Sequence, residues 1–451
     1  MGDALVWHRL QFAFTAIYHY VFPQLTMGLA PVIAWLRLRA LRDPRGDDAA
    51  LADFLARIFA VNFAFGVVTG IPMEFQFGTN WAGFSRFAGG VIGQTLAMEG
   101  VFAFFLESTF LGVLLWGGDR VGPRGKLAAS MALWAGSWLS AYFIVATNAF
   151  LQHPQGSSQQ GGVLVLEDLG ALVGNRWALA EFAHVIVAAV VTGAFVVAAI
   201  GAYYTLSDRH APRAARLLAL GTTLGLVAGF AVAFPTGDQQ AKLVARHQPV
   251  GLAAMEGRFE TGPMAGITLI GQPNIAERKL DNPIRVPGAL SFLAYGTFHS
   301  DVRGLDDFPP DLWPQNIELL YYSFHVMAGL GTIMIALMAL AILQRLRRRL
   351  DRSRLLLWAL MLSFPLPYIA NTAGWITAEL GRQPWLVYGI LRTRDGASPT
   401  VHSGDALFTL IGFCGLYLVM GVLYVLLVGR EILHGPGAGS HATAAPEAEH
   451  G

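Results

Sequence analysis

The sequence predicts an all-α, polytopic membrane protein with about nine transmembrane helices. Of its 451 residues 54 % are hydrophobic and only 14 % are charged, whereas a soluble protein carries roughly 25 % charge. This composition excludes a disordered chain, a nucleic-acid-binding protein and an ordinary soluble enzyme. The single cysteine, Cys414, excludes a disulfide framework and a thiolate metal cluster.

Nine stretches are long and apolar enough to cross the hydrocarbon core, which takes about 20 residues of helix. The first runs far past the length of a signal-peptide core, so we expect it to remain as a span. Their approximate cores are 10–36, 54–73, 91–116, 127–151, 178–206, 217–236, 317–343, 355–377 and 405–429.

Basic residues in the connections predict the orientation. The connections that follow spans one, three, five and seven are rich in arginine, at 37–45, 120–126, 209–216 and 345–354. The opposite short connections are poorer, with Arg86 alone between spans two and three. Because basic loops stay in the cytoplasm, we expect the N-terminus outside and the C-terminus inside.

These observations divide the chain into four parts. Residues 1–236 hold spans one to six, 237–316 form a loop on the outer face, and 317–430 hold spans seven to nine. The outer loop is hydrophilic, with 16 charged residues between 238 and 316, and a loop of this length is usually functional or disordered. Residues 431–451, rich in Gly, Ala, Pro and His, read as a disordered cytoplasmic tail.

Ionisable side chains inside the spans are the main candidates for function, because charge in hydrocarbon is costly. Alone, each has a simpler explanation, an interhelical hydrogen bond for a histidine or core packing for a methionine. Five helices nevertheless present such groups at the outer half of the bilayer, which favours a haem site. The candidates are His19, Glu99, Glu107, His184, His325 and Glu379, with Met327 as a soft ligand. Glu181, at the outer start of span five, is expected to face water.

Two kinds of iron site are possible with these residues. His184 and Met327 together would fill both axial positions, which suits electron transfer. His19 and Glu379 would each be a single ligand and would leave a position open for oxygen. Arg382, three residues after Glu379, can pair with that carboxylate or with a haem propionate.

Glu99 and Glu107 are eight residues apart in the third span. On a continuous α-helix this is about 80° of rotation and about 12 Å of rise. Two carboxyl groups spaced in this way indicate a proton path through the membrane. The alternative is a pair of interhelical hydrogen bonds made by protonated acids.

The segment GWITAELGRQPW at 374–385 resembles the most diagnostic motif of subunit I of the cytochrome bd-type quinol oxidases. Four further motifs of that family match in order, and the resemblance covers nearly all of 9–430. They are RLQFAFTAIYH around His19, GIPMEFQFGTNW at 70–81, AMEGVFAFFLEST around Glu99 and Glu107, and FAHVIVAAVVTGA around His184.

The resemblance implies a haem-bearing subunit of a terminal oxidase in a bacterial inner membrane. Such an enzyme oxidises quinol at the outer face and reduces oxygen to water with protons from the cytoplasm, so turnover is electrogenic without pumping. It implies a low-spin haem b on His184 and Met327, and a high-spin haem b and a haem d on His19 and Glu379. Which of these two sites holds haem d stays open. The family works with a second membrane subunit and in some members a small single-helix subunit.

The resemblance also assigns roles to other residues. Glu99 matches the position beside the oxygen-reacting haem, and Glu107 matches the next position on the proton path. Arg9 and Arg382 match arginines near haem propionates, and Trp375 lies in the same cofactor-binding motif.

In the outer loop, QPVGLAAMEGRFET matches the quinol-binding motif and places Glu256 on its functional glutamate, although a solvated loop glutamate is the simpler explanation. Two residues depart from the family: Gly251 stands where a lysine is usual, and His325 stands where many members have arginine. The short loop also fits a cyanide-insensitive bb-type oxidase without haem d. Other classes are a non-enzymatic cytochrome b, which would fill all axial positions, and a transporter, which would show internal repeats.

Overall fold

The computed structural model describes residues 2–437. Within them, nine helical segments are long and apolar enough to cross a membrane, which confirms the all-α, polytopic fold class. The tail predicted at 431–451 starts too early, because the last helix continues to His434. The rest of that prediction, beyond residue 437, lies outside the described residues.

Each predicted span falls inside one of these segments. The fifth segment, Leu169–Leu206, takes in the short α6 (Leu169–Val173) as well as α7 (Arg176–Leu206), and three others also combine two helices. The spanning segments are α1 (Gly2–Arg42), α2 (Asp48–Thr79), α3 with α4 (Ala82–Met98, Phe105–Trp116), α5 (Gly122–Gln152), α7 (Arg176–Leu206), α8 with α9 (Ala211–Ala231, Gly237–His247), α12 (Ile317–Leu346), α13 with α14 (Arg354–Leu362, Pro365–Gly381) and α16 (Ser403–His434). The short elements are α6 (Leu169–Val173), α10 (Pro249–Met255), α11 (Ala289–Tyr295), α15 (Thr393–Gly396), and the strands β1 (Ser157–Gln160), β2 (Val163–Leu166), β3 (Ile267–Asn274), β4 (Lys279–Val286), β5 (Trp385–Val387) and β6 (Leu391–Arg392).

The three composite segments have identifiable interruptions. A π-helical turn joins α3 to α4 at Glu99–Phe104, and another joins α8 to α9 at Val232–Thr236. The eighth segment restarts at Pro365, at the first position of α14, where the missing N–H costs nothing. Because π turns inside α-helices are frequent at functional sites, the turns at Glu99–Phe104 and Val232–Thr236 indicate functional positions.

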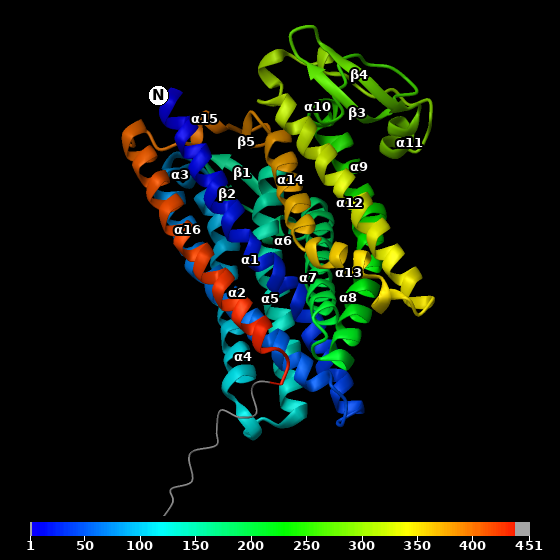
Figure 1. Ribbon diagram of the computed structural model, residues 1–451. Coiled ribbons are helices and arrows are strands. Elements are labelled where there is room, and N and C mark those ends of the chain that lie inside the picture. Colours follow the sequence, from blue (N-terminus) through cyan, green and yellow to red (C-terminus); the bar gives the residue numbers. More distant parts are fainter. Residues whose placement is uncertain (1, 438–451) are drawn as a thin grey trace, which may run out of the picture.

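The two ends of the bundle differ in chemistry (Figure 1). One end, which we call the loop side, carries the antiparallel hairpins β1–β2, β3–β4 and β5–β6 together with α10 and α11. The other end, which we call the basic side, carries the arginine-rich connections. There Asp48 is buried and accepts from both Arg39 and Arg216, while Asp47 pairs with Arg213. The four arginine-rich connections therefore lie at one end, as nine spans require.

Close contact between α1 and α7 sets the centre of the bundle. A Cβ atom added to Gly28 would lie 2.1 Å from the carbonyl oxygen of Ala189, and one added to Gly193 would lie 2.7 Å from the carbonyl carbon of Gly28. Only glycine lets the two backbones approach this closely, which is a common way to pack helices in membranes.

The segment predicted as an outer loop, 237–316, begins as a helix. Its first eleven residues form α9, which continues the sixth spanning segment to His247. After it, α10, the β3–β4 hairpin and α11 pack around a small apolar cluster that includes Leu252, Leu305 and Leu320 of α12. The loop is thus folded against the loop-side end of α12.

Candidate functional site

His19 lies on α1 and is held through one ring nitrogen. Its Nδ1 is 3.0 Å from the hydroxyl of Thr69 on α2. That hydroxyl donates its own hydrogen to the carbonyl of Phe65 at 2.7 Å, so it can only accept from the histidine. The ring therefore carries its proton on Nδ1, and Nε2 keeps the lone pair that binds a metal.

His184 on α7 repeats this arrangement. Its Nδ1 is 3.2 Å from the hydroxyl of Thr236, which donates to the carbonyl of Ala231 at 3.1 Å. Nε2 is again left as the free acceptor. Thr236 is the last residue of the second π turn, so that interruption of the helix places the hydroxyl. The sequence analysis identified neither threonine, because a threonine in a span has no distinguishing pattern.

A glycine of a neighbouring helix faces each of three candidate ligands. A Cβ atom at Gly70 would lie 3.0 Å from Cε1 of His19, and one at Gly237 would lie 3.6 Å from Cε1 of His184. At Gly374 it would lie 2.9 Å from Sδ of Met327. These side chains are only half-buried although they lie within the bundle. The backbone thus leaves room beside them, which a flat macrocycle requires.

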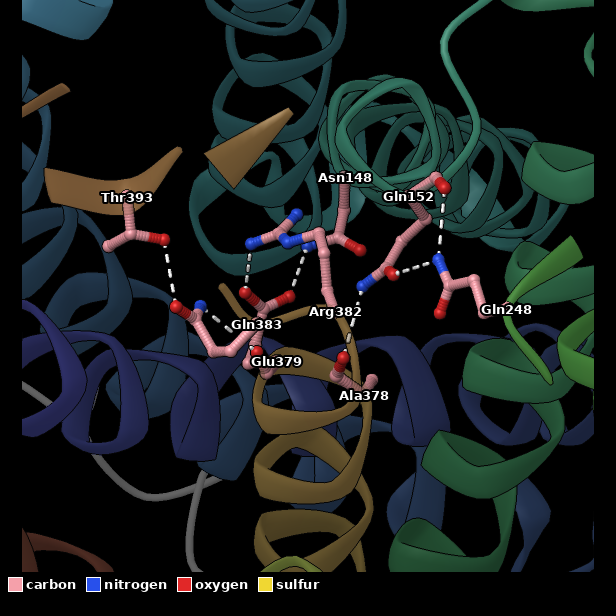
Figure 2. Close-up of polar contacts among 8 residues, drawn as sticks. All are labelled: Asn148, Gln152, Gln248, Ala378, Glu379, Arg382, Gln383 and Thr393. Carbon is pink, nitrogen blue, oxygen red and sulfur yellow. Dashed lines mark hydrogen bonds and ion pairs between the residues drawn. The ribbon is translucent and has the colours of Figure 1, made fainter. Parts of the chain in front are cut away.

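Glu379 lies at the loop-side end of α14, within a polar layer (Figure 2). Its Oε1 accepts from Nδ2 of Asn148 at 2.7 Å, and its Oε2 pairs with Nη2 of Arg382. The pairing proposed from the three-residue spacing is therefore present. Nε and Nη1 of Arg382 are buried, and within the described residues they have no partner. Two buried donors of one guanidinium fit a carboxylate such as a haem propionate.

The side-chain amides of Gln152, Gln248 and Gln383 also belong to this layer (Figure 2). Nε2 of Gln248, before α10, donates to the carbonyl and the side-chain oxygen of Gln152, both at 2.9 Å. Nε2 of Gln152 donates to the carbonyl of Ala378 at 3.3 Å, and Thr393 donates to Gln383 at 2.8 Å. The layer connects the loop-side ends of α5 and α14 to the start of the loop.

Glu181 does not face water, and the expectation that it does is wrong. It is 6 % exposed on α7, and in the described part of the chain neither of its oxygens has a hydrogen-bond partner. The first turns of α7 are covered by neighbouring elements, which a reading of one span could not reveal. Its side chain lies near Glu379 and Arg382, whose charges act on it.

Glu99 and Glu107 lie on either side of a change in helix geometry. Glu99 opens the π turn and accepts from Ser140 at 3.4 Å. Glu107 is buried on α4, and the Cβ position of Gly136 on α5 is 3.2 Å from its backbone nitrogen. Because residues 99–104 are π-helical, the rotation of about 80° expected from a uniform α-helix does not apply. The sequence analysis missed Glu74 of α2, whose charge acts on Glu99.

Glu256, in the loop, is 3 % exposed and is therefore not a solvated surface residue. Its Oε2 accepts from the backbone N–H of Thr268 at 3.1 Å. Burial raises the pKa of Glu256 to about 7, against the lowering effects of that N–H and of the charges of Arg285 and Arg258. A carboxyl group with a pKa near neutrality suits proton acceptance.

His325 connects this glutamate to α12. Its Nε2 contacts the carbonyl of Thr268 at 3.0 Å, and its Nδ1 contacts the carbonyl of Tyr321 at 2.8 Å. Both ring nitrogens of His325 thus contact backbone carbonyls, and neither is left free to bind a metal.

Gly251, at the position where the resemblance implies a lysine, packs closely against α14. A Cβ atom there would lie 3.0 Å from the carbonyl oxygen of Gly381 on α14, and the residue is buried. A lysine at this position would push α10 away from α14. A Gly251→Lys substitution would therefore disturb the packing of the loop, so a change in its activity would not report on the quinol site alone.

The contacts of two other predicted cofactor-binding residues, Arg9 and Trp375, say less about their role. Arg9 donates to the side-chain oxygen of Gln315, just before α12. Trp375 is half-buried on α14. Among the described residues there is no group of three His, Cys, Asp or Glu side chains that could hold a metal ion.

Nine apolar helical segments in the described residues, with two histidines that each offer a free Nε2 beside a glycine, fit the class of membrane cytochromes. The profile of the family described as cytochrome bd terminal oxidase subunit I matches residues 7–436. The chain belongs to this family, and this confirms the predicted enzyme class, a quinol:oxygen oxidoreductase that contains haem.

Individual relatives agree with this assignment over nearly their whole length. Cytochrome bd ubiquinol oxidase subunit 1 of Bacillus subtilis (strain 168) is 36 % identical, over 97 % of this chain and 95 % of the relative. Cytochrome bd-II ubiquinol oxidase subunit 1 of Escherichia coli (strain K12) is 31 % identical, over 97 % and 98 %. The solved bd oxidase from Geobacillus thermodenitrificans superposes with a TM-score of 0.90 at 31 % identity, covering 96 % of this chain and 99 % of that one.

Proposed function

We propose that this chain is the haem-bearing subunit I that oxidises quinol at the loop side and reduces oxygen to water inside the bundle. The observation that carries the proposal is the matched pair of histidines whose Nδ1 is fixed by a threonine and whose Nε2 is free. Haem iron supplies the electron carriers and the oxygen-binding metal when it is bound.

The ligands divide into two kinds by position. His184 and Met327 hold the low-spin haem b, each beside a glycine of an adjacent helix. His19 and Glu379 hold the two high-spin haems, a haem b and a haem d, or a second haem b in place of haem d. Arg382 binds a propionate through its two free donors, and Glu379 stays oriented by Asn148.

Quinol is oxidised beside Glu256, which takes a proton from the quinol hydroxyl. The glutamate is buried, and the peptide of Thr268 connects it to His325, two residues before Met327. This line of contacts links the loop to the low-spin site. Arg258 and Arg285 favour the ionised carboxylate that proton acceptance needs.

Protons for water enter from the basic side through Glu107 and then Glu99. Both carboxyl groups lie in the third spanning segment, and Ser140 bonds the second of them. With the basic side in the cytoplasm, proton uptake and electron entry occur from opposite faces. Turnover is then electrogenic without a pump.

The enzyme works with a second membrane subunit in a bacterial inner membrane. Some members of the family also have a small single-helix subunit. Support comes from the faces left open by this chain. In the most apolar stretch of α16 only 6 % of the residues are buried, and in that of the segment from α3 to α4 only 19 % are buried. Glu74 is also exposed, on α2, which packs against α16, α3 and α4.

The direct test is a visible spectrum of the purified, dithionite-reduced enzyme together with oxygen uptake driven by quinol. The proposal predicts low-spin haem b, high-spin haem b and quinol-dependent oxygen uptake. Extraction of the haems then separates a bd-type from a bb-type enzyme by the presence of a chlorin. An enzyme with low-spin haem alone and no oxygen uptake would be an electron-transfer cytochrome b.

A further inference from the structure

The loop at 237–316 contains a segment whose composition is not explained by the role proposed for Glu256. Between Arg285 and Asp301 there is no Asp, Glu, Lys or Arg, although 16 charged residues fall between 238 and 316. This uncharged stretch includes α11, whose sequence is ALSFLAY. A hydrophilic surface loop would not need fifteen consecutive uncharged residues.

Helix α11 is apolar on both of its faces. Leu290 and Ala294 are buried against the loop, whereas Phe292 and Leu293 are 46 % and 44 % exposed. Phe298, 51 % exposed, stacks on Phe292 with ring centroids 4.8 Å apart. A soluble loop would place polar residues on the outward face of such a helix.

The exposed apolar side chains form one continuous surface. The N–H of Gly288 bonds to the carbonyl of Met264, and the Cβ position of Gly288 is 3.0 Å from the ring of Phe298. Val286, at the end of β4, is also exposed. We call Met264, Val286, Phe292, Leu293 and Phe298 the α11 patch. Contiguous exposed apolar surface of this kind marks an interaction site.

The position of the patch indicates what covers it. The hydroxyl of Tyr295 contacts the carbonyl of Ala245 on α9, the helix that continues the sixth spanning segment. That segment exposes Val227 and Phe234 on its way out of the bundle. In Figure 1, α11 lies beneath the β3–β4 hairpin, near the level at which α14 and α16 reach the loop side. The helix that carries the patch thus contacts the loop-side end of a spanning segment that itself exposes apolar side chains.

We propose that the α11 patch inserts into the leaflet on the loop side and anchors the loop at 237–316 to the membrane. Apolar side chains of an interfacial helix bury about 5–10 Å into the headgroup and acyl boundary. Resting on the proposed function, the anchor keeps Glu256 beside the leaflet from which an apolar quinol arrives. The occupant is the acyl region of phospholipid.

The test uses the assembled enzyme in phospholipid nanodiscs with the single cysteine of this chain removed by Cys414→Ser. A nitroxide is attached at Leu293→Cys, and its collision rates with oxygen and with a water-soluble nickel chelate are measured by EPR. Val227→Cys serves as the lipid reference, and Glu277→Cys, in the β3–β4 turn, serves as the water reference. Only the signal above that of the Cys414→Ser enzyme is counted.

The proposal predicts an oxygen-to-nickel ratio at position 293 at least about fivefold above that at position 277 and close to that at position 227. A ratio equal to that at position 277 would show that the patch faces water and would overturn the proposal. Low collision rates with both reagents would show a protein partner or a second copy and would also overturn it. Neither result would affect the assignment of Glu256, which rests on activity measurements.

Discussion

Histidines in two regions of the molecule are held in opposite ways. Within the bundle, His19 and His184 each bond through Nδ1 to a threonine hydroxyl, and Nε2 stays free. At the loop side, both nitrogens of His325 contact backbone carbonyls. The first arrangement presents a lone pair to a metal, whereas the second leaves neither ring nitrogen free. The hydrogen-bond partners therefore distinguish a ligand from a structural histidine.

The largest effect is expected from removing the histidine of an oxygen site. His19→Ala should lower oxygen reduction by more than about 100-fold, because the high-spin iron loses its protein ligand. The haem content per polypeptide should fall, and oxygen-uptake assays with optical spectra would measure both. His8→Ala on the same helix is the control, since His8 bonds to Asn80 instead. Full activity in His19→Ala would remove it from the ligands.

Met327→Leu tests the partner of His184. Leucine keeps the volume of methionine but has no sulfur ligand, so the low-spin haem should become high-spin or labile. Quinol oxidase activity should fall at least about tenfold because both axial positions are needed for fast electron transfer. Met334→Leu, buried in the core of the same helix, should leave the spectrum unchanged. An unchanged low-spin spectrum in Met327→Leu would make that residue a packing residue.

Glu256→Gln tests the loop region. A carboxamide cannot accept a proton, so quinol oxidation should fall about 100-fold, while oxygen reduction with an artificial donor continues. The pKa of Glu256 is raised to about 7 by burial. Wild-type activity should therefore rise as pH increases through 7 and the carboxyl loses its proton, and this limb should be missing in the variant.

The matched control is Glu260→Gln, an exposed glutamate of the same loop. It should keep the wild-type rate and the wild-type pH profile. Equal pH profiles in wild type and Glu256→Gln would show that another group titrates. Loss of haem in Glu256→Gln would make the residue structural.

A smaller effect is expected from the threonine that orients His184. Thr236→Val removes the acceptor for Nδ1–H and should weaken retention of the low-spin haem by about 10–100-fold. Thr205→Val is the control, because that hydroxyl bonds only to its own helix. Competition of the reduced enzyme with apomyoglobin would measure haem loss. Identical loss rates in both variants would show that Thr236 does not orient the ring.

The sequence was informative wherever one residue or one span carried the signal. All nine spans were found, because an apolar stretch of about 20 residues is a local property. The buried acids and histidines could be selected because such residues are costly in lipid. These candidates could be identified from their own residue type, without knowledge of their neighbours in the fold.

The features that were missed depend on contacts between helices. Thr69 and Thr236 matter only because they face His19 and His184. The burial of Glu181 comes from elements packed over the start of α7, and the continuation of the sixth segment into α9 extends a helix beyond its apolar part. Hydropathy cannot report such tertiary features.

The most direct test of the distinction between the two regions is one pair of variants, His184→Ala and His325→Ala. Their low-temperature optical and EPR spectra should be compared with that of the wild-type enzyme. The ligand assignment predicts that the low-spin haem signal disappears in His184→Ala and persists in His325→Ala. Persistence of that signal in His184→Ala together with its loss in His325→Ala would contradict the assignment, because the free nitrogen would then not be the one that binds iron.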